Sequence, residues 1–311
     1  MPERQAIKPV ALLVFNRPDC TEKTFAAIAA ARPPTLLVVG DGPRPERPGE
    51  AERVDAVRVI VERVDWPCKV LTNFSPQNMG CRARVSSGID WVFEQVPEAI
   101  ILEDDCLPHP DFFRFCSELL DRYRDDRRVG QISGSNLHSG MARPEYSYYF
   151  SRYIHIWGWA SWRDRWQETY DVTLSRWPEL RARRWIYELF PKRREARYWE
   201  RMFDEVHAGL VDTWDYQWAA ACWQNGWLAA VPAGNLISNI GFRSDATHTT
   251  TSGEFGDLPV REIAFPLRHP REVVADARLD AGEFGRIFAV SSLRKIARKL
   301  WRAAQRSRGR L

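Results

Sequence analysis

The sequence of 311 residues has no apolar run that approaches the length of a membrane-spanning helix. Such a helix needs about twenty consecutive apolar residues, whereas the first apolar run, Val10–Phe15, has only six. This run is also too short for the core of a signal peptide, and no small-residue cleavage site follows it. We therefore expect a cytoplasmic protein.

Cys-x-x-Cys pairs are absent, although the chain has six cysteines. Their scattered spacing fits neither the common zinc sites nor the disulfide framework of a small secreted protein. A chain of this length buries roughly three quarters of its unfolded surface, so it needs neither disulfides nor a structural metal to fold. We expect all six thiols to be reduced.

Acidic residues are missing from residues 291–311, which hold eight Lys or Arg. The formal net charge of the whole chain is +4, but without those eight cations 37 basic residues face 41 acidic ones. The excess of positive charge therefore belongs to the tail, and a general nucleic-acid-binding face is not indicated.

The first third of the chain alternates apolar runs with amphipathic segments. The runs predict strands at Val10–Phe15, Leu36–Val39, Cys68–Thr72 and Ala99–Leu102. The segments between them predict helices at Thr21–Ala31, Glu50–Val64 and Gly80–Gln95. This alternation predicts an α/β fold with a mostly parallel central sheet flanked by helices.

Polar residues follow the predicted strands. Asn16 and Arg17 follow the first strand, Asp41 follows the second, and Glu103-Asp104-Asp105 follows the fourth. Ligands of parallel sheets bind at the carboxyl ends of the strands. These residues are therefore the first candidates for a functional site.

The triplet Glu103-Asp104-Asp105 places three carboxylates at the end of a buried strand. Such carboxylates repel one another and are costly to desolvate together. A divalent cation relieves both problems, and carboxylate oxygens suit Mg²⁺ or Mn²⁺. A solvated acidic turn is the alternative. Asp111, which follows shortly after, is predicted to cap a new helix.

The second half is rich in tryptophan and is predicted to be mostly helical over residues 164–225. Eleven of the fourteen tryptophans lie between Trp157 and Trp227. Most of them are expected to belong to the core of this half.

The pattern of a strand, Glu-Asp-Asp, four further residues and Pro-Asp-Phe-Phe resembles the metal-binding "DXD" segment of GT-A fold glycosyltransferases. It is similar in particular to the N-acetylglucosaminyltransferase I type and to bacterial family 2-like sugar transferases. Further segments resemble this group in the expected order: Val10–Arg17, Val38–Gly42, Asn78–Arg84, Trp157–Trp162 and Asn239–Thr249. The resemblance covers about residues 8–250, and it lacks the Gln-x-x-Arg-Trp motif of common family 2 enzymes.

This resemblance implies a Rossmann-like GT-A domain over residues 1–290 and a basic tail at 291–311. Residues 8–135 would form the nucleotide-sugar-binding half, and residues 136–260 the helical, Trp-rich acceptor half. The implied reaction is metal-dependent transfer of a sugar from a nucleotide-sugar to an acceptor hydroxyl, with inversion. A UDP-sugar is the first choice of donor and a GDP-sugar the second, and the acceptor would be a glycan or a lipid-linked molecule.

The resemblance also implies roles for particular residues. Mn²⁺ or Mg²⁺ would be held by Asp105 and by His248, which lies in a Thr-rich loop. The residues expected to contact the nucleotide-sugar are Phe15, Asn16, Arg17, Asp41, Arg82, Glu103, Asp104 and Arg243. Asp41 would accept a hydrogen bond from the base, although a role as a turn residue before Gly42 is as good an interpretation.

An inverting enzyme needs a carboxylate that takes the proton of the acceptor hydroxyl. The resemblance favours Asp215 for this role, with Asp212 second. Both residues also have a structural interpretation, because Asp212 could cap the helix that follows and Asp215 could be an acid in its first turn. Trp157, Gly158 and Trp159 are expected at the acceptor, because flat aromatic faces stack on sugar C–H surfaces.

The tail Ser291–Arg310 has the pattern of a basic amphipathic helix with one tryptophan. Peripheral contact with the anionic inner face of a membrane would suit a lipid-linked acceptor. A solvated helix and a packing arm on a partner are the alternatives.

Several functions compete with the transferase hypothesis. A nucleotidyltransferase would want a Gly-rich loop after the first strand, where this chain has Asn16-Arg17-Pro18-Asp19. A non-catalytic nucleotide- or glycan-binding module, a nucleic-acid binder that uses the tail, and a transferase acting on modified nucleic-acid bases remain open.

Overall fold

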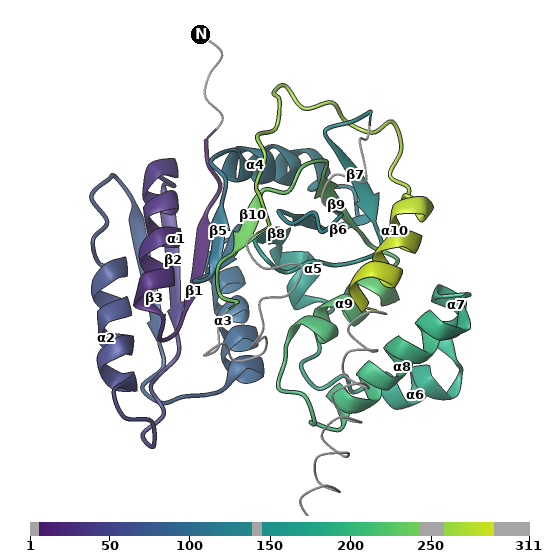
Figure 1. The fold of residues 1–311 in the computed structure, drawn as a ribbon, viewed down its shortest axis with the longest axis horizontal. Helices are drawn as coiled ribbons and strands as arrows, with labels where there is room; N and C mark the ends of the chain where they lie inside the picture. Colours follow the sequence, from purple (N-terminus) through teal and green to yellow (C-terminus); the bar gives the residue numbers. More distant parts are fainter. Residues whose placement is uncertain (1–5, 139–144, 243–257, 289–311) are drawn as a thin grey trace, which may run out of the picture.

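The computed structural model describes residues 6–138, 145–242 and 258–288 (Figure 1). In this part of the chain one eight-stranded sheet runs in the order β3-β2-β1-β4-β8-β6-β9-β7. The strands are β1 Val10–Val14, β2 Thr35–Gly40, β3 Lys69–Phe74, β4 Glu98–Glu103, β6 Val129–Ser133, β7 Tyr148–Ser151, β8 Trp159–Trp162 and β9 Leu228–Pro232. The predicted α/β class is confirmed.

The first four strands of the sheet are parallel neighbours, and the other end of the sheet is mixed. β3, β2, β1 and β4 pair in parallel, as do β6 and β9, whereas β8 and β7 pair antiparallel with their neighbours. β1 is buried along its whole length, which explains why its sequence is continuously apolar rather than alternating. All four predicted strands exist, with ends that differ from the prediction by at most two residues.

Helices cover both faces of the sheet (Figure 1). Side chains of α1, α2 and α4 pack with one face of β1, β2 and β4. Those of α3 and α9 pack with the other face, together with several tryptophans. The helices are α1 Pro18–Ala31, α2 Glu50–Val61, α3 Cys81–Gln95, α4 Asp111–Tyr123, α5 Arg163–Gln167, α6 Trp177–Ala182, α7 Trp185–Leu189, α8 Arg193–His207, α9 Asp215–Gln224 and α10 Ala277–Glu283, the last followed by a π-helical turn, Phe284–Phe288.

Helices α6, α7 and α8 form a second aromatic core with Tyr153 and Trp223. Ten of the eleven tryptophans between Trp157 and Trp227 are buried, and Trp157 is the half-buried one. The predicted core role of these residues is therefore confirmed. The helices of this half turn their apolar sides toward this core and their polar sides to solvent.

The expected cap role of Asp111 is wrong. Pro110 stands at the N-cap of α4, and Asp111 is the first residue of the helix. Its Oδ2 accepts a hydrogen bond of 3.0 Å from the backbone N–H of Ile263. The carboxylate therefore fastens a distant segment to the helix instead of capping it.

A two-stranded antiparallel sheet follows the acidic triplet. β5, Cys106–Pro108, pairs with β10, Ile237–Asn239. The pairing brings residues 239–241 beside Asp105, whose carbonyl oxygen accepts a 2.8 Å hydrogen bond from Ile240 N–H. The acidic triplet is thus held from both halves of the chain.

The helix α10 is fixed to the core through a buried glutamate. Glu283 has no exposed surface, and its two carboxylate oxygens contact Nε2 of His155 and, at 3.2 Å, Nε2 of His138. The two histidines hold the pKa of Glu283 down at about 2 against the opposing effect of burial, which is the largest single influence. Asp280, one turn earlier, accepts hydrogen bonds from Ser151 Oγ and from the Arg152 N–H.

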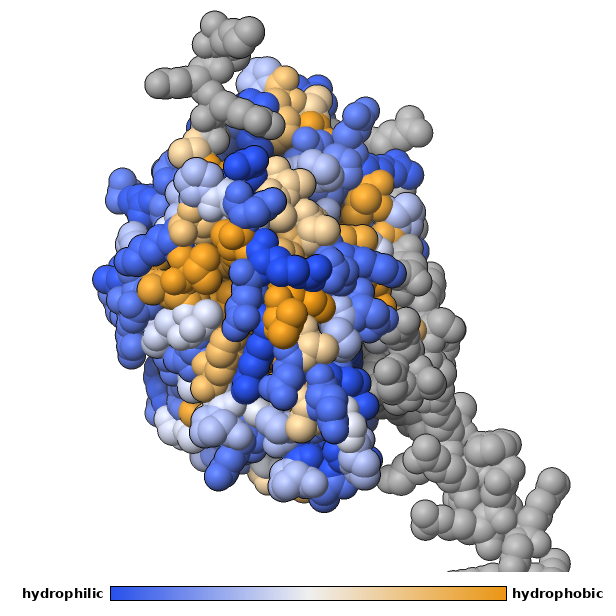
Figure 2. Space-filling model, turned by 90° about the vertical axis from the view of Figure 1, so that its left-hand side faces the viewer, coloured by the Kyte–Doolittle hydropathy of each residue, from blue (hydrophilic) through white to orange (hydrophobic). Residues whose placement is uncertain are grey.

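The edge of the sheet at β3 carries exposed apolar side chains. Val70 is 38% exposed and Val59 of the adjacent α2 is 60% exposed. Figure 2 looks at this side of the molecule, and its apolar patches are small and separated by hydrophilic side chains. Of the helices in the described ranges, none combines the length and apolarity needed to cross a membrane.

Candidate functional site

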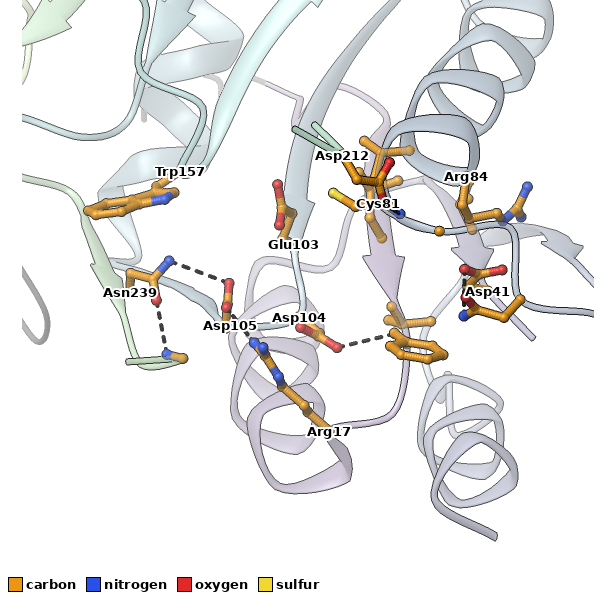
Figure 3. Close-up of a pocket in the computed structure, with 18 of the residues that line it drawn as sticks. Arg17, Asp41, Cys81, Arg84, Glu103, Asp104, Asp105, Trp157, Asp212 and Asn239 are labelled. Atoms are coloured by element: carbon orange, nitrogen blue, oxygen red, sulfur yellow. Dashed lines mark hydrogen bonds and ion pairs between the residues drawn. The ribbon is translucent and has the colours of Figure 1, made fainter. Parts of the chain in front are cut away.

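A cavity of about 340 Å³ opens at the carboxyl ends of β1, β2 and β4. Figure 3 shows its labelled side chains in a row, with Trp157 and Asn239 at one end and Asp41 and Arg84 at the other. The acidic triplet lies between these ends. The lining residues are Leu13, Val14, Phe15, Arg17, Val39, Asp41, Arg44, Asn78, Gly80, Cys81, Arg84, Val85, Glu103, Asp104, Asp105, Trp157, Asp212, Asn239, Gly241 and Phe242.

The three carboxylates of the triplet have different partners. Asp105 Oδ2 lies 2.7 Å from Nη1 of Arg17, and its Oδ1 lies 3.5 Å from Asn239 Nδ2. Asp104 Oδ2 accepts a 3.2 Å hydrogen bond from the backbone N–H of Phe15. Glu103 contributes a buried Oε1 that has no hydrogen-bond partner among the described residues.

Crowding of negative charge dominates the electrostatics of this turn. Burial raises the pKa of Glu103 well above its usual range, and the charges of Asp105 and Asp104 raise it further. Burial and the charge of Asp105 also raise the pKa of Asp104 to about 7, against the opposing effect of Arg17. A turn in which adjacent carboxylates have raised pKa values is typical of a site that receives a cation.

Gly241 leaves the space that the Asp105 carboxylate occupies. A Cβ atom at position 241 would lie 2.0 Å from Asp105 Oδ2, far inside contact distance. Gly241 N–H in turn donates a 2.9 Å hydrogen bond to Asn239 Oδ1. Only glycine therefore allows the end of β10 to approach the acidic triplet this closely.

At the other end of the cavity, Asp41 is held by donors from its neighbour Gly42 and from the loop before α3. Its carboxylate accepts hydrogen bonds from the N–H groups of Gly42 and Met79 and from Asn78 Nδ2. Burial nevertheless raises the pKa of Asp41, because it outweighs these hydrogen bonds. The structure thus supports the interpretation of Asp41 as a turn residue, and it also places the carboxylate in the lining of the cavity.

Arg84 lines the cavity, whereas the sequence favours Arg82. Arg84 is buried, its Nε donates a 3.1 Å hydrogen bond to the Gly40 carbonyl, and burial lowers its pKa. The Arg82 backbone N–H instead donates to Asp212. Both arginines belong to the segment Asn78–Arg84. Which of the two lines the cavity depends on how α3 packs against the sheet.

Asn16 is directed to a neighbouring ion pair and is not among the lining residues. Its Nδ2 donates a 2.8 Å hydrogen bond to Oε1 of Glu50, which also pairs with Arg44. The Arg44 hydrogen bonds lower the pKa of Glu50 to about 2. Arg44 itself lines the cavity. The sequence does not identify Arg44, because it lies in a proline-rich loop with no motif around it.

The segment before α9 places two carboxylates near the cavity. Asp212 lines it, and its two oxygens accept hydrogen bonds of 3.1 Å from the backbone N–H groups of Cys81 and Arg82 at the start of α3. Asp215 is the first residue of α9 and accepts a hydrogen bond from Thr213 Oγ1. The charge of Asp215 raises the pKa of Glu103 and of Cys81, so it acts on two lining residues without being one.

Of the three acceptor candidates, Trp157 alone is in the lining. Its ring packs edge-on against Phe242, with ring centroids 5.3 Å apart. Trp159 is 1% exposed and stacks on Trp214 in the core. Gly158 is buried at a positive φ of 61°, and a Cβ there would lie 2.5 Å from Ile237. Trp159 and Gly158 therefore have structural roles, in the packing next to Trp157.

A divalent cation fits this site when substrate phosphates complete its coordination, rather than protein side chains alone. Among the described residues no group of three or more His, Cys, Asp or Glu is arranged to hold a metal ion. Mg²⁺ is commonly held by one or two carboxylates together with substrate phosphates. Asp105, which is partly exposed to the cavity, fits this mode of binding. His248, the other expected metal ligand, and Arg243, which is expected to contact the nucleotide-sugar, lie outside the described residues.

No family model matches the chain, and no curated protein does so. Among solved structures, the chain is similar to 4-diphosphocytidyl-2C-methyl-D-erythritol synthase from Anaerococcus prevotii DSM 20548, with a TM-score of 0.33 and 8% identity over 52% of this chain and 76% of that one. It is also similar to UDP-glucose pyrophosphorylase complexed with UDP-glucose, with a TM-score of 0.29 and 10% identity over 51% of this chain and 78% of that one. Likeness at this level says nothing about substrate or reaction.

Proposed function

We propose that this protein transfers a sugar from a nucleotide-sugar to an acceptor hydroxyl. The observation that carries the proposal is the order of groups along the cavity in Figure 3. Asp41 and Arg84 offer polar contacts for a nucleoside, the acidic triplet with Arg17 can bind a diphosphate with its counter-ion, and Trp157 offers an aromatic surface for a sugar. This order is that of the parts of a nucleotide-sugar.

Asp105 and Arg17 would bind the diphosphate. A guanidinium pairs well with phosphate oxygens, and Arg17 is already held in the cavity by its 2.7 Å contact with Asp105. Mn²⁺ or Mg²⁺ on Asp105, when bound, would neutralise charge that grows on the leaving group. The raised pKa values of Glu103 and Asp104 fit such a role, because a nearby cation would favour their charged forms.

Asp215 would act as the general base. In the proposed step the acceptor oxygen forms a bond to the anomeric carbon of the sugar while its proton passes to the Asp215 carboxylate. The bond between that carbon and the diphosphate breaks, and the leaving diphosphate keeps the electron pair. Asp212 is the second candidate, since it lines the cavity, but both of its oxygens are engaged by α3.

The donor half of the proposal is tested by calorimetry. UDP, GDP, CDP and dTDP are titrated into the protein with and without Mn²⁺, and binding of one of them that strengthens with metal is expected. Asp105→Ala should remove the metal-dependent part, whereas the exposed Asp125→Ala is the matched control. If the folded protein binds no nucleotide with metal present, the transferase proposal is wrong.

The base is tested by separating binding from turnover. Asp215→Asn should bind the nucleotide like the wild type and lose about 10²–10⁴-fold in turnover, the usual contribution of a general base. Asp212→Asn is compared in the same assay. A wild-type rate in Asp215→Asn would remove Asp215 from this role, and loss confined to Asp212→Asn would transfer the role to that residue.

A further inference from the structure

Positive charge is concentrated in residues 176–201, the segment that includes α6, α7 and the first part of α8, far from both the acidic triplet and the tail in sequence. Residues 176–201 contain nine Arg or Lys and four acids, in a chain whose net charge is only +4. All nine cations are exposed, whereas Glu195 is buried and Glu200 half-buried. We call these nine cations the basic face: Arg176, Arg181, Arg183, Arg184, Lys192, Arg193, Arg194, Arg197 and Arg201.

The centre of the basic face is the first half of α8. Arg193, Arg197 and Arg201 recur every four residues and so lie along one side of this helix. The opposite side, which includes Trp199 and Phe203, is buried in the aromatic core. The cationic side is therefore fixed outward by packing, and not by a flexible loop.

Most of these charges are not neutralised within the protein. Arg181, Arg183 and Arg201 form salt bridges with Asp204, Glu179 and Glu205, respectively. Lys192, Arg193, Arg194 and Arg197 form none with any residue in the described ranges. The two exposed acids of the segment, Glu179 and Glu188, lie outside this run of four. Uncompensated like charges at such spacing cost stability, which is a reason to look for an anionic partner.

The chemical character of the basic face restricts the class of partner that could bind it. A protein interface needs an apolar centre, and a single-strand binder needs exposed rings on which bases stack. Here Trp185, Tyr198 and Trp199 are buried, and the half-buried ring of Tyr187 is covered by the Arg184 guanidinium, 4.6 Å from its centroid. The cations lie on α6 and α8 and in the segments that flank α6 and α7, so they are too many and too widely distributed for one small anion. We infer that the basic face docks on the surface of an anionic lipid bilayer.

Docking through this face would place on the lipid the helices that lie at the same end of the molecule as the cavity. In Figure 1 the helices α6 and α8 lie at the lower end of the molecule, toward which β1 runs and where α3 begins. The cavity opens at that end of the sheet, and the segment after α8 supplies Asp212 to its lining. The preference for lipid over another polyanion rests on the proposed function, since a lipid-linked acceptor would be met there.

The test is sedimentation of the full chain with vesicles of phosphatidylcholine, with and without phosphatidylglycerol. Binding is expected only to the anionic vesicles and should weaken as salt is raised. The triple variant Arg193→Glu, Arg194→Glu, Arg197→Glu should lose at least about a hundredfold in partition, since each cation near an anionic surface contributes about fivefold. No nucleotide is needed, so failure here is distinct from failure of the transferase proposal.

Two controls make the outcome specific. The matched variant Lys23→Glu, Arg32→Glu, Lys69→Glu changes the net charge by the same amount. Its three positions lie in α1, at the C-terminal end of α1 and in β3, at the other side of the molecule. This variant should bind vesicles like the wild type. The variant Lys295→Glu, Arg298→Glu, Lys299→Glu changes the tail. The inference is overturned if vesicles bind none of the proteins, if the tail variant alone loses binding, or if the basic face prefers duplex DNA over vesicles in competition. Circular dichroism and urea unfolding check that each variant is folded.

Discussion

Asp212 binds the start of a helix that begins 131 residues earlier in the chain, through the backbone N–H group of Cys81 at 3.1 Å. Its other oxygen accepts from the next N–H group, that of Arg82, at the same distance. A carboxylate at the N-terminus of a helix satisfies donors that the helix cannot pair and favours its dipole. The helical half of the protein thus supplies an anchor for α3 at the mouth of the cavity.

Asp212→Ala should therefore lower the free energy of unfolding by about 1 kcal/mol, as the loss of a helix-capping carboxylate usually does. Asp212→Asn should cost less, because its amide oxygen can still accept one of the two hydrogen bonds. Urea unfolding followed by circular dichroism measures both, with Asp125→Ala as the control. Equal stability of Asp212→Ala and the wild type would show that the anchor contributes nothing.

Gly241→Ala should disturb the acidic turn. The new Cβ would overlap Asp105 Oδ2, so the carboxylate or β10 must shift. Overpacking of this kind costs about 1–3 kcal/mol, and metal-dependent nucleotide binding should weaken with it. Gly285→Ala is the matched control, because a Cβ there meets no atom within 4 Å. Calorimetry on the two variants gives the comparison, and unchanged binding in Gly241→Ala would contradict the close approach.

Glu283→Gln should destabilise the attachment of α10. Loss of a buried, hydrogen-bonded carboxylate leaves its partners unsatisfied, which typically costs about 1–3 kcal/mol. The pKa of Glu283 is lowered, so its contribution is fully present above the unfolded pKa of about 4.5 and is lost as the pH falls toward 2. Urea unfolding of the wild type and the variant should therefore differ most near neutral pH and converge in acid. A constant difference over that range would argue against the ionised carboxylate.

Asp280→Asn should have the opposite dependence on pH. Burial raises the pKa of Asp280 to about 6, so the folded protein binds this proton more tightly than the unfolded chain does. The wild type should lose stability relative to the variant as the pH rises from about 4 to 6, by roughly 1–3 kcal/mol, and the difference should then stay constant. Urea unfolding of the wild type and Asp280→Asn across this pH range tests the prediction. A loss of wild-type stability relative to the variant that grows toward low pH would contradict the raised pKa.

The sequence predicts the parallel part of the fold well because its signals are local. Val10–Val14 and Thr35–Gly40 are buried on both faces, so each strand is visible in the sequence as a continuous apolar run. The two three-residue strands β5 and β10 have no such signature, and only their pairing defines them. The role of Asp111 could not be predicted for the same reason, because its hydrogen-bond partner Ile263 lies 152 residues away in the sequence.

Within the site, the residue types are predicted better than their individual roles. The acidic triplet, Arg17, Asp41 and Trp157 all line one cavity. Arg84 and Arg82 are two positions apart, and sequence spacing cannot tell which of them faces the sheet. Trp159 resembles Trp157 in the sequence, but Trp159 begins β8 and packs in the core, whereas Trp157 precedes the strand and is separated from it by Gly158 at a positive φ of 61°.

The pairing of β5 with β10 sets a lower limit on any working fragment of this protein. A truncated chain that ended after the first half, near residue 135, would keep Glu103, Asp104 and Asp105 but lack Ile237–Asn239, the strand that runs beside them. It would also lack Gly241, which leaves room for the Asp105 carboxylate, and Asp212, which anchors α3. Attempts to isolate a minimal nucleotide-binding unit, or to exchange halves between proteins, should therefore place the boundary beyond Phe242.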